Sequence, residues 1–150
     1  MSAPRSDAAS VLIVTSRYYA DIAAELEAGV TNALDAAGVG HEFLVVPGAF
    51  EIPGAIALAS QVQEFDGFVA LGCVIRGETS HYDLICGEVA RGLMDLSLSG
   101  VPVGFGVLTC ENEDQARVRA DRKQKNKGRE VVEAVLRMIA LSRTFGDIEA

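Results

Sequence analysis

Short apolar runs alternate with longer amphipathic stretches along this chain. The short runs are rich in β-branched residues, which predicts strands, and they cover residues 11–15, 43–46, 68–75 and 101–108. The longer stretches carry apolar residues at helical spacing, and they cover residues 21–37, 51–62, 80–98 and 114–122, with a last helix around 132–139. Gly38 stands where a C-terminal cap of the first helix belongs.

The first run, residues 11–15, suits a strand that is buried on both faces of a parallel sheet. Strands that alternate with helices imply right-handed crossovers and helices on both faces of the sheet. We therefore predict the α/β class, as a flavodoxin-like three-layer α/β/α sandwich with a four-stranded parallel sheet. No linker divides the chain, so residues 11–150 should form a single domain behind a flexible N-terminal segment, residues 1–10.

The composition is that of a globular protein, with 49% hydrophobic and 23% charged residues in a chain of 150. Neither a signal-peptide core nor a run long enough to span a membrane is present in the sequence. The protein should therefore be soluble and cytoplasmic. Its three cysteines form no CxxC pair, which argues against a disulfide framework and against a cysteine-based metal site.

The formal net charge of −8 disfavours nucleic acid and anionic membranes as partners. Seven of the thirteen basic residues nevertheless lie between positions 117 and 129. We interpret most of them as a solvated helix face and loop, and a minority as able to hold a small anion.

In open parallel sheets, ligands bind beyond the carboxyl ends of the strands. Tyr18 follows the first run and can stack on a flat heterocycle, although a loop tyrosine is more often packing or surface. Glu51 follows the second run and is expected to open a helix there. Its carboxylate can accept hydrogen bonds from a polyol or can simply favour the helix dipole, and the two readings are about even.

The third run leads into residues 72–83, the most informative stretch of the chain. Its glycine, its hydroxyls and the free backbone N–H groups of a helix start are suited to phosphate. The order of residues is not that of a Walker loop. His81 stands in the first turn of that helix, where we favour a role in proton transfer. The other histidine, His41, precedes the second strand and is assigned no role.

Phe105 is expected just after the fourth strand, where it can wall an aromatic pocket. The polar cluster that follows contains Thr109 and Asn112, and either of them can cap the next helix.

These four segments, in this order and at these separations, resemble the signature of the lumazine synthases, and the similarity runs from about Val11 to Phe145. The resemblance implies condensation of 5-amino-6-ribitylaminopyrimidinedione with 3,4-dihydroxy-2-butanone 4-phosphate. The products would be 6,7-dimethyl-8-ribityllumazine, phosphate and water, in the penultimate step of riboflavin biosynthesis. The resemblance implies that neither a metal nor an organic cofactor is needed.

The resemblance also implies roles for residues of this sequence. The pyrimidinedione and its ribityl chain would be bound by Tyr18, Ala49, Phe50, Glu51, Cys73, Val74, Ile75 and Phe105. The phosphate would be held by Glu78, Thr79 and Arg119, and catalysis would involve His81, Arg119 and Lys127. In the family Phe105 comes from a neighbouring subunit, so each site would lie between two protomers.

Family members form pentamers, and in many species the pentamers close into an icosahedral shell. The mean hydropathy of +0.24 agrees with an oligomer, because we expect one small core to hide only part of so many apolar side chains. Four residues depart from the common family pattern: Tyr19, Glu78, Asp121 and Lys125. Asp121 and Lys125 replace glycines near the turn that influences assembly, so we predict a pentamer and make no claim of a shell.

Two other functions are compatible with the pattern. One is a flavin- or lumazine-binding protein that has kept the pocket and lost useful catalysis, and the other is a protein that mainly builds a shell. His81, Thr79 and Arg119 argue against the binding protein, because simple binding needs no histidine beside a phosphate site.

Overall fold

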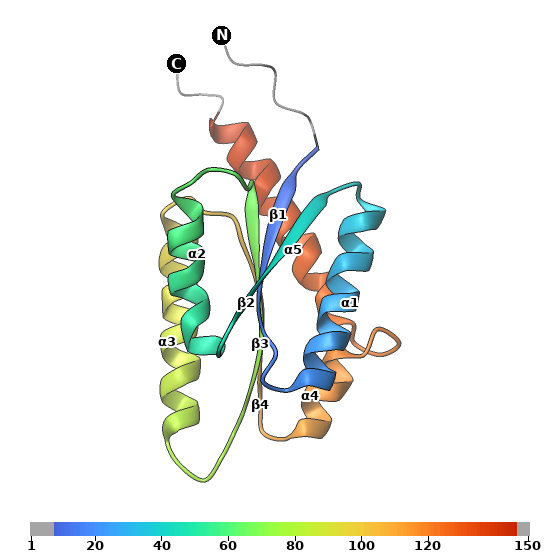
Figure 1. Ribbon diagram of the computed structural model, residues 1–150, viewed down its shortest axis with the longest axis vertical. Coiled ribbons are helices and arrows are strands. Elements are labelled where there is room, and N and C mark those ends of the chain that lie inside the picture. Colours follow the sequence, from blue (N-terminus) through green and yellow to red (C-terminus); the bar gives the residue numbers. More distant parts are fainter. Residues whose placement is uncertain (1–7, 147–150) are drawn as a thin grey trace.

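The computed structural model describes residues 8–146 and contains a single parallel sheet of four strands in the order β2-β1-β3-β4 (Figure 1). The strands are β1 (Ser10–Ser16), β2 (Gly40–Val46), β3 (Gly67–Ile75) and β4 (Val103–Cys110). All three neighbouring pairs are parallel. The predicted four-stranded parallel sheet is therefore confirmed. Strands β2 and β4 form its two edges.

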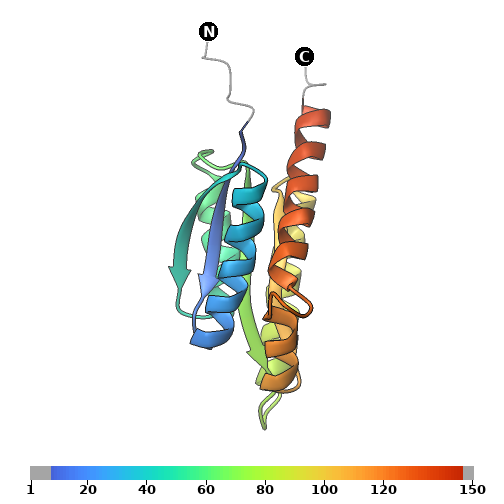
Figure 2. The same cartoon turned by 90° about the vertical axis from the view of Figure 1, so that its right-hand side faces the viewer.

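Helices cover both faces of the sheet, as predicted (Figure 1). They are α1 (Ala20–Ala36), the 3-10 turn η1 (Ala49–Glu51), α2 (Ile52–Ser60), α3 (His81–Leu98), α4 (Glu113–Ala120) and α5 (Lys127–Gly146). Helices α2 and α3 lie on one face, and α1, α4 and α5 lie on the other. In Figure 2 the loop between β3 and α3 and helix α4 lie at the end of the molecule to which the strands point.

The central strand β1 is buried on both of its faces. Val11 and Ile13 pack in the core under α1 and α5, whereas Leu12 and Val14 pack in the core under α2 and α3. This alternation explains why the sequence of β1 is apolar at every position from 11 to 14 instead of at every second one. Complete burial of a side chain such as Ile13 stabilises the fold by roughly 1.5–3 kcal/mol.

Helix α1 ends at the predicted glycine. Gly38 has a φ of +71°, and its N–H donates to the Asp35 carbonyl at 3.1 Å, while the N–H of Val39 donates to the Leu34 carbonyl at 2.9 Å. This pair of bonds is the Schellman motif, which needs a left-handed residue at the position of Gly38. Val39 then enters the core, so the chain passes directly into β2.

Two expected positions were wrong in detail. Phe105 lies inside β4 and not after it, because the strand extends to Cys110, which pairs with Ile75. Glu51 ends the η1 turn and is the N-cap residue of α2, so the helix itself begins one residue later than expected, at Ile52. Of the expected flexible segment, residues 1–10, positions 1–7 lie outside the described residues. Ser10 already belongs to β1.

Two negative findings hold for residues 8–146. None of their helices is long and apolar enough to cross a membrane. Across the same part of the chain, no group of three or more His, Cys, Asp and Glu side chains is arranged to hold a metal ion.

Candidate functional site

The loops that follow β1 and β2 present two exposed aromatic side chains. Tyr18, directly after β1, is 78% exposed, and Phe50, directly after β2, is 58% exposed. The Tyr18 ring meets the ring of Tyr19 edge to face at 5.0 Å. Because β1 and β2 are neighbours in the sheet, these loops lie at one end of the molecule, where exposed rings can stack on a flat ligand.

The η1 turn holds Glu51 beside the end of β3. A Cβ added at Gly48 would come within 3.3 Å of the Glu51 Oε1, so the carboxylate folds back over this glycine. Among residues 8–146 no donor pairs with the Glu51 carboxylate, which leaves it available to ligand hydroxyls. A Cβ added at Gly72 would lie 3.6 Å from the Cβ of Ala49, so the turn packs closely on β3.

The last residues of β3, Cys73 to Ile75, are half-buried. Desolvation by burial raises the pKa of the Cys73 thiol to about 12. This thiol is therefore neutral at ordinary pH and acts as an apolar lining group, because the thiolate is the nucleophilic form. Cys73 contacts the core under α1, and Val74 contacts the core on the opposite face of the sheet.

The loop between β3 and α3 is exposed from Gly77 to Ser80, and α3 begins at His81. The backbone N–H of His81 donates to the Thr79 Oγ1 at 3.3 Å, and no side chain caps the helix. Free N–H groups at a helix start, together with hydroxyls, are suited to bind an anion. The His81 imidazole has no hydrogen-bond partner within the described chain, so it is free to exchange a proton with a ligand.

Arg76 supports this loop, although no pattern in the sequence singles it out. Its Nε donates to the Glu111 carboxylate at 2.7 Å, and its other nitrogens donate to Asp83 at 3.3 and 3.4 Å. Its guanidinium also lies over the Tyr82 ring, 4.4 Å from the centroid. Arg76 thus joins the end of β3 to the first turn of α3 and to the loop after β4. Its partner Glu111 lies 35 residues away, so no local pattern reveals the contact.

Three predicted residues lie elsewhere, at the edge strand β4. Phe105, Arg119 and Lys127 line a hollow of about 280 Å³. Arg119 uses one nitrogen to donate to the Gln115 carbonyl at 3.0 Å, and Lys127 donates to Glu130 at 3.2 Å. The hollow thus combines an aromatic wall with a half-buried guanidinium and an ammonium group, which suits an anion attached to a larger organic ligand.

The predicted site residues therefore form two groups within one chain. We call the first the strand-end group: Tyr18, Ala49, Phe50, Glu51, Cys73, Val74, Ile75, Glu78, Thr79 and His81. We call the second the β4-edge group: Phe105, Arg119 and Lys127. No member of the strand-end group lines the β4 hollow. Across residues 8–146, no hydrogen bond or ion pair joins the two groups.

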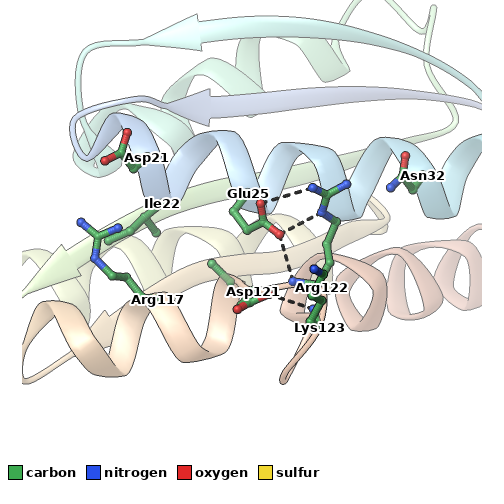
Figure 3. A pocket seen from close by; sticks show the side chains of 9 residues that line it. Asp21, Ile22, Glu25, Asn32, Arg117, Asp121, Arg122 and Lys123 are labelled. Atoms are coloured by element: carbon green, nitrogen blue, oxygen red, sulfur yellow. Dashed lines mark hydrogen bonds and ion pairs between the residues drawn. The ribbon is translucent and has the colours of Figure 1, made fainter.

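The other basic residues between 117 and 129 behave largely as expected. Arg117 pairs with Glu113 at 3.5 Å and Arg129 with Glu133 at 3.0 Å, both on exposed helix faces. Arg122 pairs with Glu25 at 2.8 Å beside a hollow of about 770 Å³ between α1 and α4 (Figure 3). Of the two candidate caps of α4, Asn112 is the one used, and it accepts from the N–H of Gln115 at 2.9 Å.

The class follows from the parallel sheet, the exposed aromatic rings of its loops and the uncapped helix start that carries His81: an α/β protein of the kind that binds ligands at the carboxyl ends of its strands. Residues 8–143 match the 6,7-dimethyl-8-ribityllumazine synthase family. The chain belongs to this family, and its activity is lumazine synthesis in riboflavin biosynthesis.

Individual relatives agree with this assignment, and each is named as a 6,7-dimethyl-8-ribityllumazine synthase. The protein from Sphingopyxis alaskensis is 52% identical over 138 residues, which cover 92% of this chain and 98% of the relative. The protein from Novosphingobium aromaticivorans is 54% identical over 133 residues, 89% of this chain and 96% of the relative. The protein from Erythrobacter litoralis is 49% identical over 138 residues, 92% of this chain and 99% of the relative.

Proposed function

We propose that this chain condenses 5-amino-6-ribitylaminopyrimidinedione with 3,4-dihydroxy-2-butanone 4-phosphate at a site that two copies of the chain complete. The strand-end group of one copy supplies one wall of the site, and the β4-edge group of the next copy supplies the other. The observation that carries this proposal is the separation of the two groups within one chain. A reaction between two substrates requires both groups to face the same space.

The edges of the sheet support an association of this kind. Phe43 and Val45 of the edge strand β2 are 40% and 50% exposed, and Phe105 of the edge strand β4 is 42% exposed. Edge strands with exposed apolar side chains are surfaces that proteins usually cover. The two edges differ in sequence, so contact between them is heterologous, and a heterologous contact forms a ring when its rotation closes. We take the ring to be the pentamer that the family resemblance implies.

In this arrangement the strand-end group binds the pyrimidinedione. Tyr18 and Phe50 stack on the ring or on its ribityl chain, and both are exposed enough to do so. Ala49 and the last residues of β3, Cys73 to Ile75, line the ring pocket. Glu51 accepts hydrogen bonds from ribityl hydroxyls, because its carboxylate has no donor within the described chain.

The phosphate is bound where the two copies meet. The helix-start amides near Glu78 and the Thr79 hydroxyl hold it from one copy, and Arg119 of the neighbouring copy pairs with it through charge-assisted hydrogen bonds. The Glu78 side chain is exposed and negative, so the contact is assigned to its backbone.

His81 is the proton-transfer group of this scheme. Attack of the substrate amine on the carbonyl, loss of water and elimination of phosphate all move protons, and a free imidazole can accept and return them. Arg119 and Lys127 stabilise the negative charge that builds up on the leaving phosphate. Phe105 closes the pocket from the side of the neighbouring copy.

The test combines activity with mass. Purified protein incubated with both substrates should produce the fluorescent lumazine, and light scattering should give five times the 15.8 kDa chain mass or a multiple of that pentamer. A fully active monomer would refute the shared site. A protein that binds the substrates without turnover would instead be the binding homologue.

A further inference from the structure

Helix α1 holds the turn between α4 and α5 at two points that lie one helical turn apart. At the first point, the backbone N–H and the Nε of Arg122 donate to the Glu25 Oε1 at 3.0 and 2.8 Å (Figure 3). At the second point, a Cβ added at Gly128 would lie 2.8 Å from the Leu26 carbonyl oxygen and 2.9 Å from the Val30 nitrogen. Helices α1 and α5 therefore meet backbone to backbone.

The segment between these two points is a closed turn. The Asp121 carbonyl accepts from the N–H groups of Gln124 and Asn126, both at 3.0 Å, and the Asp121 carboxylate accepts from the N–H of Lys123 at 2.8 Å. Asn126 adopts a left-handed φ of +44°, and its side chain accepts from the N–H of Arg129 at 3.4 Å, at the start of α5. These bonds tie residues 121–129 to one another.

The turn connects two members of the β4-edge group. Arg119 lies in the last turn of α4, just before Asp121, and Lys127 is the first residue of α5. Both line the same hollow on the β4 side, whereas Arg122 and Glu25 line the hollow on the α1 side. A displacement of the turn therefore changes where Arg119 and Lys127 stand relative to each other.

We propose that Glu25 is a positioning residue for the phosphate end of the reaction, which it serves by holding Arg122 and with it the turn that sets the geometry of Arg119 and Lys127. This inference rests on the proposed function, in which Arg119 binds the phosphate. Glu25 does not itself touch the substrate in this scheme. The hydrogen bonds from Arg122 lower the pKa of the Glu25 carboxyl, which agrees with a firmly held carboxylate.

The signs of the two charges make the inference testable. Glu25→Gln removes a negative charge and Arg122→Gln removes a positive one, so their long-range effects on a bound phosphate have opposite signs. If the contact acts by positioning, both variants instead raise the KM for the butanone phosphate. Glu25→Asp, which keeps the charge and shortens the side chain, should raise it as well.

The experiment measures the KM of each substrate for the three single variants and for the Glu25→Gln, Arg122→Gln double variant. We expect increases of between about 2-fold and 5-fold for the butanone phosphate, the upper value being the limit for one exposed ion pair, and less than about 2-fold for the pyrimidinedione. The double variant should be no worse than the more impaired single variant, because one contact is lost in each case.

The matched controls are Asp21→Asn and Arg117→Gln. Both residues line the same hollow (Figure 3), and the two substitutions remove the same charges, but the side chain of neither residue bonds to the turn. Both should leave the KM values within about 2-fold of the unmodified protein, since a lost surface charge has little effect. Thermal unfolding of each variant shows whether it is still folded, and so distinguishes a displaced Arg119 or Lys127 from a loss of the fold.

Three outcomes would each overturn the inference. They are KM changes of opposite sign for Glu25→Gln and Arg122→Gln, no change in KM for either variant, and equal changes in KM for the two substrates. Arg119→Ala distinguishes this failure from a failure of the proposed function. If Arg119→Ala weakens the butanone phosphate selectively and the Glu25 variants do not, only the positioning role is wrong. If Arg119→Ala has no selective effect, the phosphate assignment itself is wrong.

Discussion

The strand-end group and the β4-edge group are built in different ways. The strand-end group combines the half-buried end of β3 with exposed loops whose binding atoms are largely backbone amides and side chains without partners, such as those of Glu51 and His81. The β4-edge group stands on an edge strand and on two helices that pack against α1, and its charged residues already have protein contacts.

This difference suggests that the two groups have different roles. Loops with free polar groups can adapt to a ribityl chain and can exchange protons. A guanidinium on a packed helix is held in place before the phosphate arrives, which reduces the cost of ordering it on binding. Substitutions of Arg119 and Lys127 in the β4-edge group should therefore affect phosphate binding, and those of Glu51 and His81 in the strand-end group should affect the pyrimidinedione or turnover.

The largest effect is expected for Arg119→Ala. Loss of charge-assisted hydrogen bonds should raise the KM for the butanone phosphate by between about 10-fold and 100-fold. The KM for the pyrimidinedione should change by less than about 2-fold, since Arg119 does not bind that substrate in the proposed site. Steady-state titration of each substrate measures both values. Arg117→Ala, in the same helix, is the control, and equal weakening of both substrates would contradict the assignment.

His81→Ala should affect turnover more than binding. We expect kcat to fall by about 10-fold or more, at the low end for a general acid–base group, because this condensation also proceeds slowly without a catalyst. Fluorescence of the lumazine product gives the rate. His41→Ala is the matched control, since His41 pairs with Asp35 at the other end of β2. Unchanged kinetics for His81→Ala would remove His81 from the mechanism.

Gly128→Ala should show how much the packing of α5 on α1, which supports the β4-edge group, contributes to stability. The new Cβ would lie within 3.0 Å of backbone atoms of α1, which cannot move aside without separating the helices. We expect the free energy of unfolding to fall by about 1–3 kcal/mol, as measured by urea denaturation. Gly87→Ala in α3 meets no atom within 4 Å and should raise the stability by up to about 1 kcal/mol. Equal stabilities would show that α1 and α5 do not pack as described.

The smallest effect concerns the lining of the strand-end pocket. The Cys73 thiol, with its pKa raised to about 12 by burial, should react with iodoacetamide at pH 8 more slowly than an ordinary thiol. The pKa of this thiol is about 9 in the unfolded chain and about 12 in the folded protein. Its contribution to the free energy of unfolding is therefore complete below pH 9 and is lost as the pH rises to about 12. Mass spectrometry of each labelled cysteine measures the rates. Labelling of Cys73 as fast in buffer as in urea would contradict its burial.

Most of the fold was predictable from the sequence, because its signals are local. The apolar run of β1 is read directly from four consecutive residues, and Gly38 ends α1 as its position indicated. The start of β4 was misplaced because Val101 and Pro102 continue the apolar run. Proline has no N–H to donate to a sheet, and pairing with β3 begins at Val103.

Much less of the site was predictable from local patterns. Arg76 and Glu111 lie 35 residues apart, and Glu25 and Arg122 lie 97 residues apart. Neither pair leaves a pattern within any one helix or strand. The division of the site residues between the carboxyl ends of the strands and the edge strand β4 depends on the strand order, which periodicity does not specify. The family resemblance named the residues, and the structure shows which of them one chain brings together.

The central claim is that each site takes one group from each of two copies, and mixing two impaired variants, assayed at a butanone phosphate concentration below the KM of the unmodified protein, tests it most directly. His81→Ala chains keep the β4-edge group intact, and Arg119→Ala chains keep the strand-end group intact. If the two are refolded together in equal amounts, about a quarter of the interfaces should join two intact groups, and about a quarter of the activity of the unmodified protein should return. Activity no higher than the mean of the two separate variants would contradict a shared site.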